Sequence, residues 1–553
     1  MKKQILVALL GGVLLLTAFT GCGADGGAGK TAGGKKDELV YVNYRDIRNL
    51  NLPWLLFKIY PFLRYVNYRD IRNLNPHLYA GEMYAQSMLY DTLVTNTEKG
   101  YVGCLAESWT ISPDGRTYTF KIRPGVTFSD GTPCDANAIL ANFNAILENR
   151  ERHTWLEMMN LLTSVSAPDK DTFVIEMSEP YYPMLTELAC IRPFAMISPK
   201  SMKNGSTKDG VTSYIGTGPY VLKDFVTDEY AVFERNEKYW GKKPALKKIT
   251  VKVIPDNQTR IMALENGEID LIFGKNMLDA DAISQYVKSD KFTTQLSNPT
   301  STRHIVFNTT HEILGESAVR KALQHATNRK AISEGIFYGL EPAADTLYSP
   351  TVPYCNVGLE PYAYNTAAAG QLLDQAGWVM ASDGLRAKDG QKLELDLLYN
   401  SDSVTEKTIA EYLQSEYRKL GIALNIHGEE EQSYRDNMKA GNFDMVFNIC
   451  WGMPYDPQSS LAAMRAPVYG DFATQQGLAD KAEIDQAITD ILTSTDEAKR
   501  QELYKFVLTR LHEDAVYLPL TYETNKALYT SKLKGVHFGI DQYDVDFASM
   551  YFE

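Results

Sequence analysis

The chain has 553 residues, of which 44% are hydrophobic, 23% charged and 11% aromatic. These values are ordinary for globular proteins, and they exclude wholesale disorder, collagen and a protein that spans the membrane many times. At about 150 residues per domain, the length corresponds to three or four domain-sized units. The formal net charge of −13 argues against nucleic acid as a partner, because phosphates attract basic surfaces.

The N-terminus has the pattern of a bacterial signal peptide. Lys2 and Lys3 precede an apolar run over residues 5–19, which is shorter than the roughly 20 residues that span a bilayer. Small residues follow the run and lead to Cys22, as in a lipoprotein signal. We therefore expect residues 1–21 to be removed and Cys22 to be lipidated. The alternative is an ordinary secretory signal followed by a chance cysteine.

A short polar segment follows the signal. Residues 22–36 are rich in Gly, Ala and Lys without apolar periodicity, which predicts a flexible tether. Loss of the signal removes two lysines and changes the net charge to −15. The remaining cysteines have no paired spacing, so no disulfide framework is predicted, and most are expected to be small buried residues. They are Cys104, Cys134, Cys190, Cys355 and Cys450.

An exact repeat lies near the start of the mature chain. The sequence YVNYRDIRNLN occurs at residues 41–51 and again at residues 65–75. Two copies are too few for a solenoid, which indicates a local duplication. Only one copy can form the first strand. We expect the second copy to do so, since it runs directly into Pro76, and residues 41–64 to be the spare insertion.

The first half of the chain is rich in strand signals. Residues 117–122 alternate polar and apolar side chains between two turn sequences, as in a half-buried strand. Residues 172–177 and 249–254 are predicted strands as well. Asp135 is a suitable N-cap for a helix with an apolar stripe. The stripe comprises Ile139, Leu140, Phe143, Ile146 and Leu147.

The second half alternates between helix and strand. Helices are predicted over residues 318–336, 366–376, 404–420 and most of 481–511, and strands over 393–399, 422–426 and 443–449. This alternation predicts α/β lobes. No long polar linker divides the mature chain, so two lobes joined by crossing segments fit better than separate domains. The crossing segments are expected at residues 297–308 and 518–526.

The common enzyme signatures are missing. The sequence has no G-x-S-x-G, no H-E-x-x-H and no complete phosphate-binding loop. The segment IGTGPY at residues 215–220 lacks the third glycine of a dinucleotide loop, and Pro219 removes a backbone donor there. None of the eight histidines is paired at metal-ligand spacing. The sequence therefore predicts a protein that is not an enzyme.

Several segments together resemble the family 5 extracellular solute-binding proteins, the capture subunits of ABC importers. The resemblance runs from about residue 37 to the C-terminus. It is carried by LAESW and SPDGRTYTF within residues 105–120, RPGVTFSDG at 123–131, IGTGPY at 215–220 and NEKYWG at 236–241. It implies a two-lobed α/β fold of the periplasmic-binding-protein type (class II, cluster C) with a ligand cleft between the lobes.

Within this family the sequence is most similar to the nickel-binding branch, whose members hold nickel as a chelate with small carboxylate-bearing molecules. The similar segments are LNPHLY and MYAQSM at residues 74–88, RHTWLE at 152–157, IRPF at 191–194, WGMPYDP at 451–457, QQGLADK at 475–481 and LHEDAVYLP at 511–519. The resemblance implies a Ni²⁺ chelate as ligand, with haem as a lesser possibility. It also implies ABC permease and ATPase subunits as partners.

The resemblance also nominates site residues. Arg192 lies among apolar residues, where a charge is costly without a partner, and a guanidinium binds a carboxylate through two parallel bonds. Arg192 is therefore the predicted clamp for a ligand carboxylate, with a structural salt bridge as the alternative. Trp155 and Trp451 would stack on the ligand, and Tyr79, Met83 and Tyr455 would line the pocket.

One position departs from the nickel-binding branch. Tyr469 stands where the branch often has a metal-binding histidine, and a neutral phenol is a poor ligand for Ni²⁺. Either the chelator supplies all donor atoms or the ligand differs. His77 and His304 are the candidates to compensate, although no spacing supports them.

These observations predict a monomeric binding lipoprotein on the outer face of the cytoplasmic membrane, either on the periplasmic side or at the cell surface. Lobe I would comprise residues 37–300 with a return segment at 525–553, and lobe II would comprise 301–524. Two alternatives stay open. The ligand could be a di- or oligopeptide, or the chain could be a signalling or structural lipoprotein that binds no solute.

Overall fold

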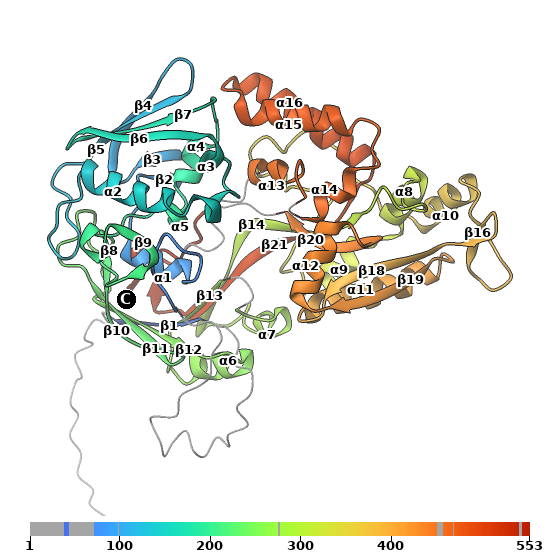
Figure 1. The fold of residues 1–553 in the computed structure, drawn as a ribbon. Helices are drawn as coiled ribbons and strands as arrows, with labels where there is room; N and C mark the ends of the chain where they lie inside the picture. Colours follow the sequence, from blue (N-terminus) through green and yellow to red (C-terminus); the bar gives the residue numbers. More distant parts are fainter. Residues whose placement is uncertain are drawn as a thin grey trace, which may run out of the picture. The chain divides into compact units, whose positions relative to one another are not determined.

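The computed structural model describes residues 38–43, 71–97, 99–274, 277–450, 457–467, 469–540 and 545–553. Helices and strands are mixed along all of the longer segments (Figure 1), so the α/β class is confirmed. None of the helices in these segments is long and apolar enough to cross a membrane.

The largest sheet has ten strands and contains both parallel and antiparallel pairs. Its two longest strands, β14 (Phe292–Phe307) and β21 (Tyr517–Thr530), are antiparallel neighbours near the middle (Figure 1). Strand β21 contains the crossing segment predicted at 518–526, and β14 contains all but the last residue of the one predicted at 297–308. The order is β10 (Tyr220–Val226), β11 (Tyr230–Arg235), β12 (Lys248–Val253), β1 (Glu38–Asn43), β13 (Leu271–Gly274), β21 (Tyr517–Thr530), β14 (Phe292–Phe307), β20 (Met445–Cys450), β18 (Glu394–Asn400) and β19 (Ala423–Glu429).

Strand β1 corrects the prediction for the repeat. It pairs in parallel with β12 and with β13, and it contains residues 41–43 of the first copy. The described chain resumes at Ile71, inside the second copy. The first copy therefore supplies the strand, and the predicted spare segment 41–64 is wrong at its start. The two copies are identical but their flanking residues differ, and residues 38–40 run directly into the first copy to form one strand with it.

A second sheet of four antiparallel strands is built from residues 106–177. Its order is β4 (Ala106–Ile111), β5 (Thr117–Ile122), β7 (Thr172–Met177) and β6 (Leu162–Asp169). Helix α2 (Ala136–Leu147) lies between β5 and β6 in the chain, and the Asp135 carboxylate accepts a hydrogen bond from the backbone N–H of Ala138 at 3.0 Å. The predicted strands and the predicted N-cap are confirmed.

Short elements complete this half of the described chain. The helices are α1 (Met83–Leu89), η1 (Arg150–His153), α3 (Glu157–Leu161), α4 (Met184–Leu188), α5 (Ile191–Phe194), η2 (Pro199–Ser201), α6 (Asn257–Glu265) and α7 (Ala280–Ser284). The strands are β2 (Val94–Thr97), β3 (Gly100–Gly103), β8 (Met202–Lys203) and β9 (Ser206–Val211).

Two long helices predicted in the second half are each divided. In place of one helix over 318–336, α8 (Ser317–Ala326) ends and Asn328 caps α9 (Arg329–Gly335), accepting a hydrogen bond from the N–H of Ala331 at 3.0 Å. In the same way α15 (Lys481–Thr493) ends and Asp496 caps α16 (Glu497–Glu513). A polar side chain that satisfies free N–H groups starts a new helix even where the apolar pattern continues.

The helices of the second half are α8 (Ser317–Ala326), α9 (Arg329–Gly335), α10 (Thr366–Gln375), α11 (Val404–Arg418), α12 (Glu431–Ala440), α13 (Pro457–Ala463), α14 (Gly470–Gln475), α15 (Lys481–Thr493), α16 (Glu497–Glu513) and η3 (Phe547–Ser549). Its short strands are β15 (Val379–Met380), β16 (Arg386–Lys388), β17 (Gln391–Lys392), β22 (Leu533–Lys534) and β23 (Tyr551–Phe552).

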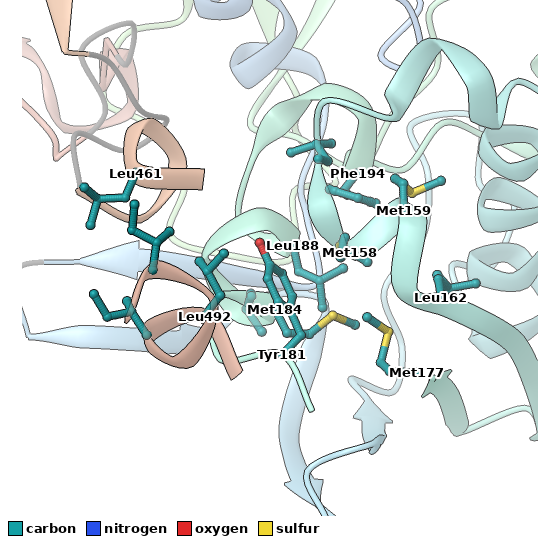
Figure 2. Close-up of a cluster of buried hydrophobic side chains, with 14 of the residues drawn as sticks. Met158, Met159, Leu162, Met177, Tyr181, Met184, Leu188, Phe194, Leu461 and Leu492 are labelled. Carbon is teal, nitrogen blue, oxygen red and sulfur yellow. The ribbon is translucent and has the colours of Figure 1, made fainter. Parts of the chain in front are cut away.

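One apolar cluster joins residues from both halves of the chain (Figure 2). Met184 and Leu188 of α4 belong to it together with Leu461 of α13 and Leu492 of α15. The backbone supports this contact, because the N–H of Tyr182 donates to the carbonyl of Leu492 at 3.0 Å. The two halves are therefore in contact at α4 as well as along β14 and β21.

The IGTGPY segment packs against the end of α1. A Cβ atom on Gly216 would lie 2.0 Å from the carbonyl oxygen of Leu89, and one on Gly218 would lie 2.5 Å from the carbonyl carbon of Leu89. The Thr217 hydroxyl between them donates to Asp91 at 2.8 Å, and Trp240 donates to the same carboxylate at 2.9 Å. The motif is therefore a close backbone contact and not a nucleotide loop.

Gly216→Ala should lower the free energy of unfolding by about 3 kcal/mol, because the backbone must move to admit the methyl group. Urea unfolding measures this change. Gly335→Ala is the matched control, since its Cβ would meet nothing within 4 Å and alanine is favoured over glycine in a helix. Equal stability of the two variants would contradict the close-contact interpretation.

Candidate functional site

Three of the predicted site residues come together around Tyr79. Tyr79 precedes α1, Trp155 lies between η1 and α3, and Arg192 is in α5. The Trp155 ring is 5.9 Å from the Tyr79 ring in an edge-on arrangement, and the guanidinium carbon of Arg192 is 5.8 Å from the centre of the same ring. The structure thus groups residues from three separate segments of the sequence.

The Tyr79 hydroxyl has two hydrogen-bond partners. The indole N–H of Trp155 donates to it at 2.8 Å, and Nδ1 of His153 lies 2.6 Å from it. Tyr79 is half-buried, and burial raises the pKa of its hydroxyl above the ordinary value. Trp155 is 40% exposed, so its ring is accessible to a ligand. Such a ring suits stacking on a flat molecule.

Arg192 is half-buried and not enclosed, in contrast to the expectation from its apolar neighbours. Pro193 and Phe194 are buried, while the arginine side chain reaches the segment that precedes α1. Its Nη1 donates to the carbonyl of Gly81 at 3.1 Å. This carbonyl and the Tyr79 ring are neutral groups that orient the guanidinium, and a carboxylate is the ligand group that best matches its charge and shape.

The other predicted pocket residues are distributed differently. Met83 is the first residue of α1 and is buried, with 7% of its surface exposed. Trp451 and Tyr455 lie outside the described residues, as does Cys22. Tyr469 immediately precedes α14 and is half-buried. Burial raises the pKa of Tyr469, which keeps it a neutral phenol and a poor metal ligand at neutral pH.

The two histidine candidates differ in their hydrogen bonds. Both ring nitrogens of His77 have hydrogen-bond partners: Nδ1 lies 2.9 Å from the Thr207 hydroxyl and Nε2 lies 3.3 Å from the Ala195 carbonyl. Burial lowers the pKa of His77 to about 3. It is a satisfied core histidine, and its proposed role as a metal ligand is not supported.

His304 is also buried, and Nδ1 must donate to the Thr302 carbonyl at 3.1 Å. Its Nε2 then bears the lone pair and is buried without a hydrogen-bond partner among the described residues. The described segments contain no cluster of three His, Cys, Asp or Glu side chains that could hold a metal ion. The five cysteines in these segments form no disulfide with one another, and four of them are buried.

Sequence reasoning missed two residues of this region. His153 is fully buried and touches Tyr79, although it stands next to the predicted Trp155 segment in the motif RHTWLE. Glu187 accepts hydrogen bonds from the Tyr181 hydroxyl at 2.6 Å and from the N–H of Met158 at 3.1 Å. The bond to Met158 thereby holds the first turn of α3, which begins two residues after Trp155.

Glu187 should make stability dependent on pH. Burial raises its pKa from 4.5 to about 8 in the folded chain, so the folded state favours the protonated form. The contribution of Glu187 to the free energy of unfolding is therefore largest below pH 4.5, and it decreases as the pH rises to about 8. Glu187→Gln should remove this dependence, and its melting temperature relative to wild type should rise between pH 5 and 8. A difference that is constant over that range would contradict the shifted pKa.

Comparison with known proteins gives consistent matches. Residues 100–471 match the model of the "Bacterial extracellular solute-binding proteins, family 5 Middle". The nickel-binding periplasmic protein of Escherichia coli K12 is 45% identical over 451 residues, covering 81% of this chain and 86% of that protein.

Solved structures agree with these matches. NikA from Brucella suis, in complex with Fe(III)-EDTA, has a TM-score of 0.86 and 42% identity, and the match covers 93% of this chain and 100% of that one. NikZ from Campylobacter jejuni, in complex with Ni(L-His), has a TM-score of 0.72 and 22% identity over 93% and 99% of the two chains. The second match concerns the fold alone. Together the matches show the two-lobed α/β fold of periplasmic binding proteins.

Proposed function

This chain belongs to family 5 of the bacterial extracellular solute-binding proteins, which serve ABC importers and are not enzymes, and on that premise we propose that its solute is a nickel chelate. The metal is cargo and not a resident cofactor. It would arrive already bound to a small molecule that carries carboxylate groups.

The observation that carries this proposal is the position of Arg192 beside the Tyr79 and Trp155 rings. A guanidinium next to aromatic surface suits a ligand with a carboxylate on one side and a flat or apolar part on the other. A chelated metal ion presents both, because the chelator covers the metal and offers its own carboxylates. Neither His77 nor Tyr469 offers a free donor suited to bare Ni²⁺.

The relatives support a metal chelate. The Escherichia coli protein is named for nickel binding, and the Brucella suis structure holds Fe(III)-EDTA. EDTA is itself a polycarboxylate chelator. The proposal extends these properties to this chain because the identity exceeds 40% in both cases.

Isothermal titration calorimetry on the mature chain tests the ligand. Ni²⁺ with two equivalents of L-histidine should bind at a 1:1 ratio of complex to protein, whereas Ni²⁺ alone should give little heat. Di- and tripeptides without metal, and haem, form the comparison series. Tight binding of a peptide, or of haem, with no binding across a panel of nickel chelates would replace the proposed ligand.

The lobe boundaries form part of the proposal. Lobe I would comprise residues 37–300 and 525–553, and lobe II residues 301–524, with β14 and β21 passing between them. Their long antiparallel pairing supports this assignment, since paired strands can act as the hinge about which the lobes close on a ligand. The closed form would then be offered to the permease and its ATPase.

We also propose the lipid anchor at Cys22. Two lysines, the apolar run at residues 5–19 and the small residues before Cys22 support it. Cys22→Ser should release the processed chain from the membrane fraction into the soluble fraction, while the wild-type chain stays membrane-bound. Release of both chains alike would leave an ordinary secretory signal as the correct interpretation.

A further inference from the structure

The hydrogen bonds around Tyr79 have a fixed direction. An indole N–H can only donate, so the Tyr79 oxygen must accept from Trp155 at 2.8 Å. The hydroxyl hydrogen of Tyr79 then has one acceptor within reach, Nδ1 of His153 at 2.6 Å. No third partner of this hydroxyl is found among the described residues, and the bonds therefore run from Trp155 through Tyr79 to His153.

This direction determines the tautomer of His153. If Nδ1 accepts a hydrogen bond, it carries no proton, and a neutral imidazole must then hold its proton on Nε2. The ring is fully buried, and burial together with Arg152 lowers the pKa of His153 to about 4. The ring is thus neutral at physiological pH. Nε2 is buried and has no hydrogen-bond partner within the described segments.

We propose that His153 is a positioning residue of the ligand site, which fixes the Tyr79 hydroxyl and through it the Trp155 indole before the ligand binds. The site that it serves rests on the proposed function. Ordering a side chain in advance lowers the cost that binding would otherwise include. Because Arg192 lies over the face of Tyr79, the same contact also supports the position of the guanidinium.

The hydrogen bonds that run from Trp155 through Tyr79 to His153 form a relay, and this relay has a consequence for ligand specificity. The Tyr79 hydroxyl accepts a hydrogen bond from Trp155 and donates its hydrogen to His153. It therefore has no hydrogen left to donate to a ligand. A ligand carboxylate near these three residues must therefore be bound by Arg192, and Tyr79 and Trp155 offer it ring surface only. This arrangement selects a ligand that places a carboxylate at Arg192 and a flat or apolar group at Trp155, and it disfavours one that needs a second hydroxyl donor.

Two substitutions of His153 separate positioning from packing. In His153→Asn the amide oxygen can replace Nδ1 as acceptor, whereas His153→Leu fills a similar volume without an acceptor. We expect the leucine variant to bind Ni²⁺ with two equivalents of L-histidine about 10-fold more weakly than wild type, and the asparagine variant to remain within about 3-fold. His427→Leu, at an exposed histidine, is the control for the substitution itself. An equal loss of affinity in both His153 variants would overturn the proposal.

A second measurement needs no ligand. Nitrogen-15 NMR of the histidine-labelled wild-type chain should show the His153 ring protonated on Nε2 and bare on Nδ1, with the signal assigned by its loss in His153→Asn. The opposite tautomer would overturn the relay. If wild type bound no nickel chelate, the proposed function would fail while this result still decided the relay, so the two failures are distinguishable.

Discussion

Arg192→Ala should lower the affinity for Ni²⁺ with two equivalents of L-histidine by at least about 100-fold, equivalent to about 2.7 kcal/mol. Removing the guanidinium leaves the ligand carboxylate without its charged partner, and the hydroxyl of Tyr79 is not free to replace it. Arg192→Lys keeps the charge but loses the planar fork, so we expect an intermediate loss of about 10-fold. Calorimetry on the three proteins gives the affinities.

The same change should lower the free energy of unfolding only moderately. Within the described segments, Arg192→Ala removes the hydrogen bond to the Gly81 carbonyl and the contact with the Tyr79 ring, and these two contacts are together worth about 1 to 2 kcal/mol. Urea unfolding of the ligand-free chain measures this. Arg116→Ala, at an exposed arginine in the turn between β4 and β5, is the control for loss of one positive charge.

Two results would point to a structural arginine instead. One is a loss of more than about 3 kcal/mol of unfolding free energy in the ligand-free chain, the cost expected when a buried ion pair is broken. The other is an affinity equal to that of the Arg116→Ala control. Either would leave the Tyr79 group without its proposed role in binding a carboxylate.

Elements with local signals were predictable from the sequence. The strands expected at 117–122 and 172–177 match β5 and β7 residue for residue, because alternation and flanking turns are properties of a few neighbouring residues. The helix capped by Asp135 was predictable for the same reason. The breaks at Asn328 and Asp496 carry a local signal as well, since both residues are good N-caps, but the continuing apolar pattern concealed them.

Other features depend on tertiary structure. The strand that pairs with β12 and β13 contains residues of the first copy of the repeat, and this long-range pairing cannot be read from the eleven residues that the two copies share. The grouping of Tyr79, Trp155 and Arg192 was expected from family resemblance and not from periodicity. The role of His153 could not be predicted, because the direction of a hydrogen bond between residues 74 positions apart requires coordinates.

The largest effect on stability is expected at Arg303 in β14. Its guanidinium forms an ion pair with Glu523 of β21 and lies 3.8 Å from Glu341. Lys526 adds a second positive charge, 3.3 Å from Glu341. The four side chains are between 4% and 11% exposed. They therefore form a buried network of alternating charge that ties β14 to β21.

Arg303→Met should lower the free energy of unfolding by about 3 to 5 kcal/mol, because two buried carboxylates then share a single lysine. The hydrogen bonds that Ser301 gives to Glu523 and Thr521 gives to Glu341 do not replace the lost charge. The loss should change little with added salt, since ions do not screen a buried pair effectively. Urea unfolding at low and high ionic strength measures both quantities.

Glu523→Gln in the same chain should return part of that stability, because the double variant no longer buries the carboxylate that Arg303 neutralised. Non-additivity of about 1 to 3 kcal/mol is expected for residues in direct contact. Lys407→Met, at an exposed pair with Glu411, is the matched control and should cost less than about 0.5 kcal/mol. If Arg303→Met cost no more than this control, charge pairing would not be what holds β14 and β21 together. The apolar and backbone contacts of these strands would then suffice for any hinge role.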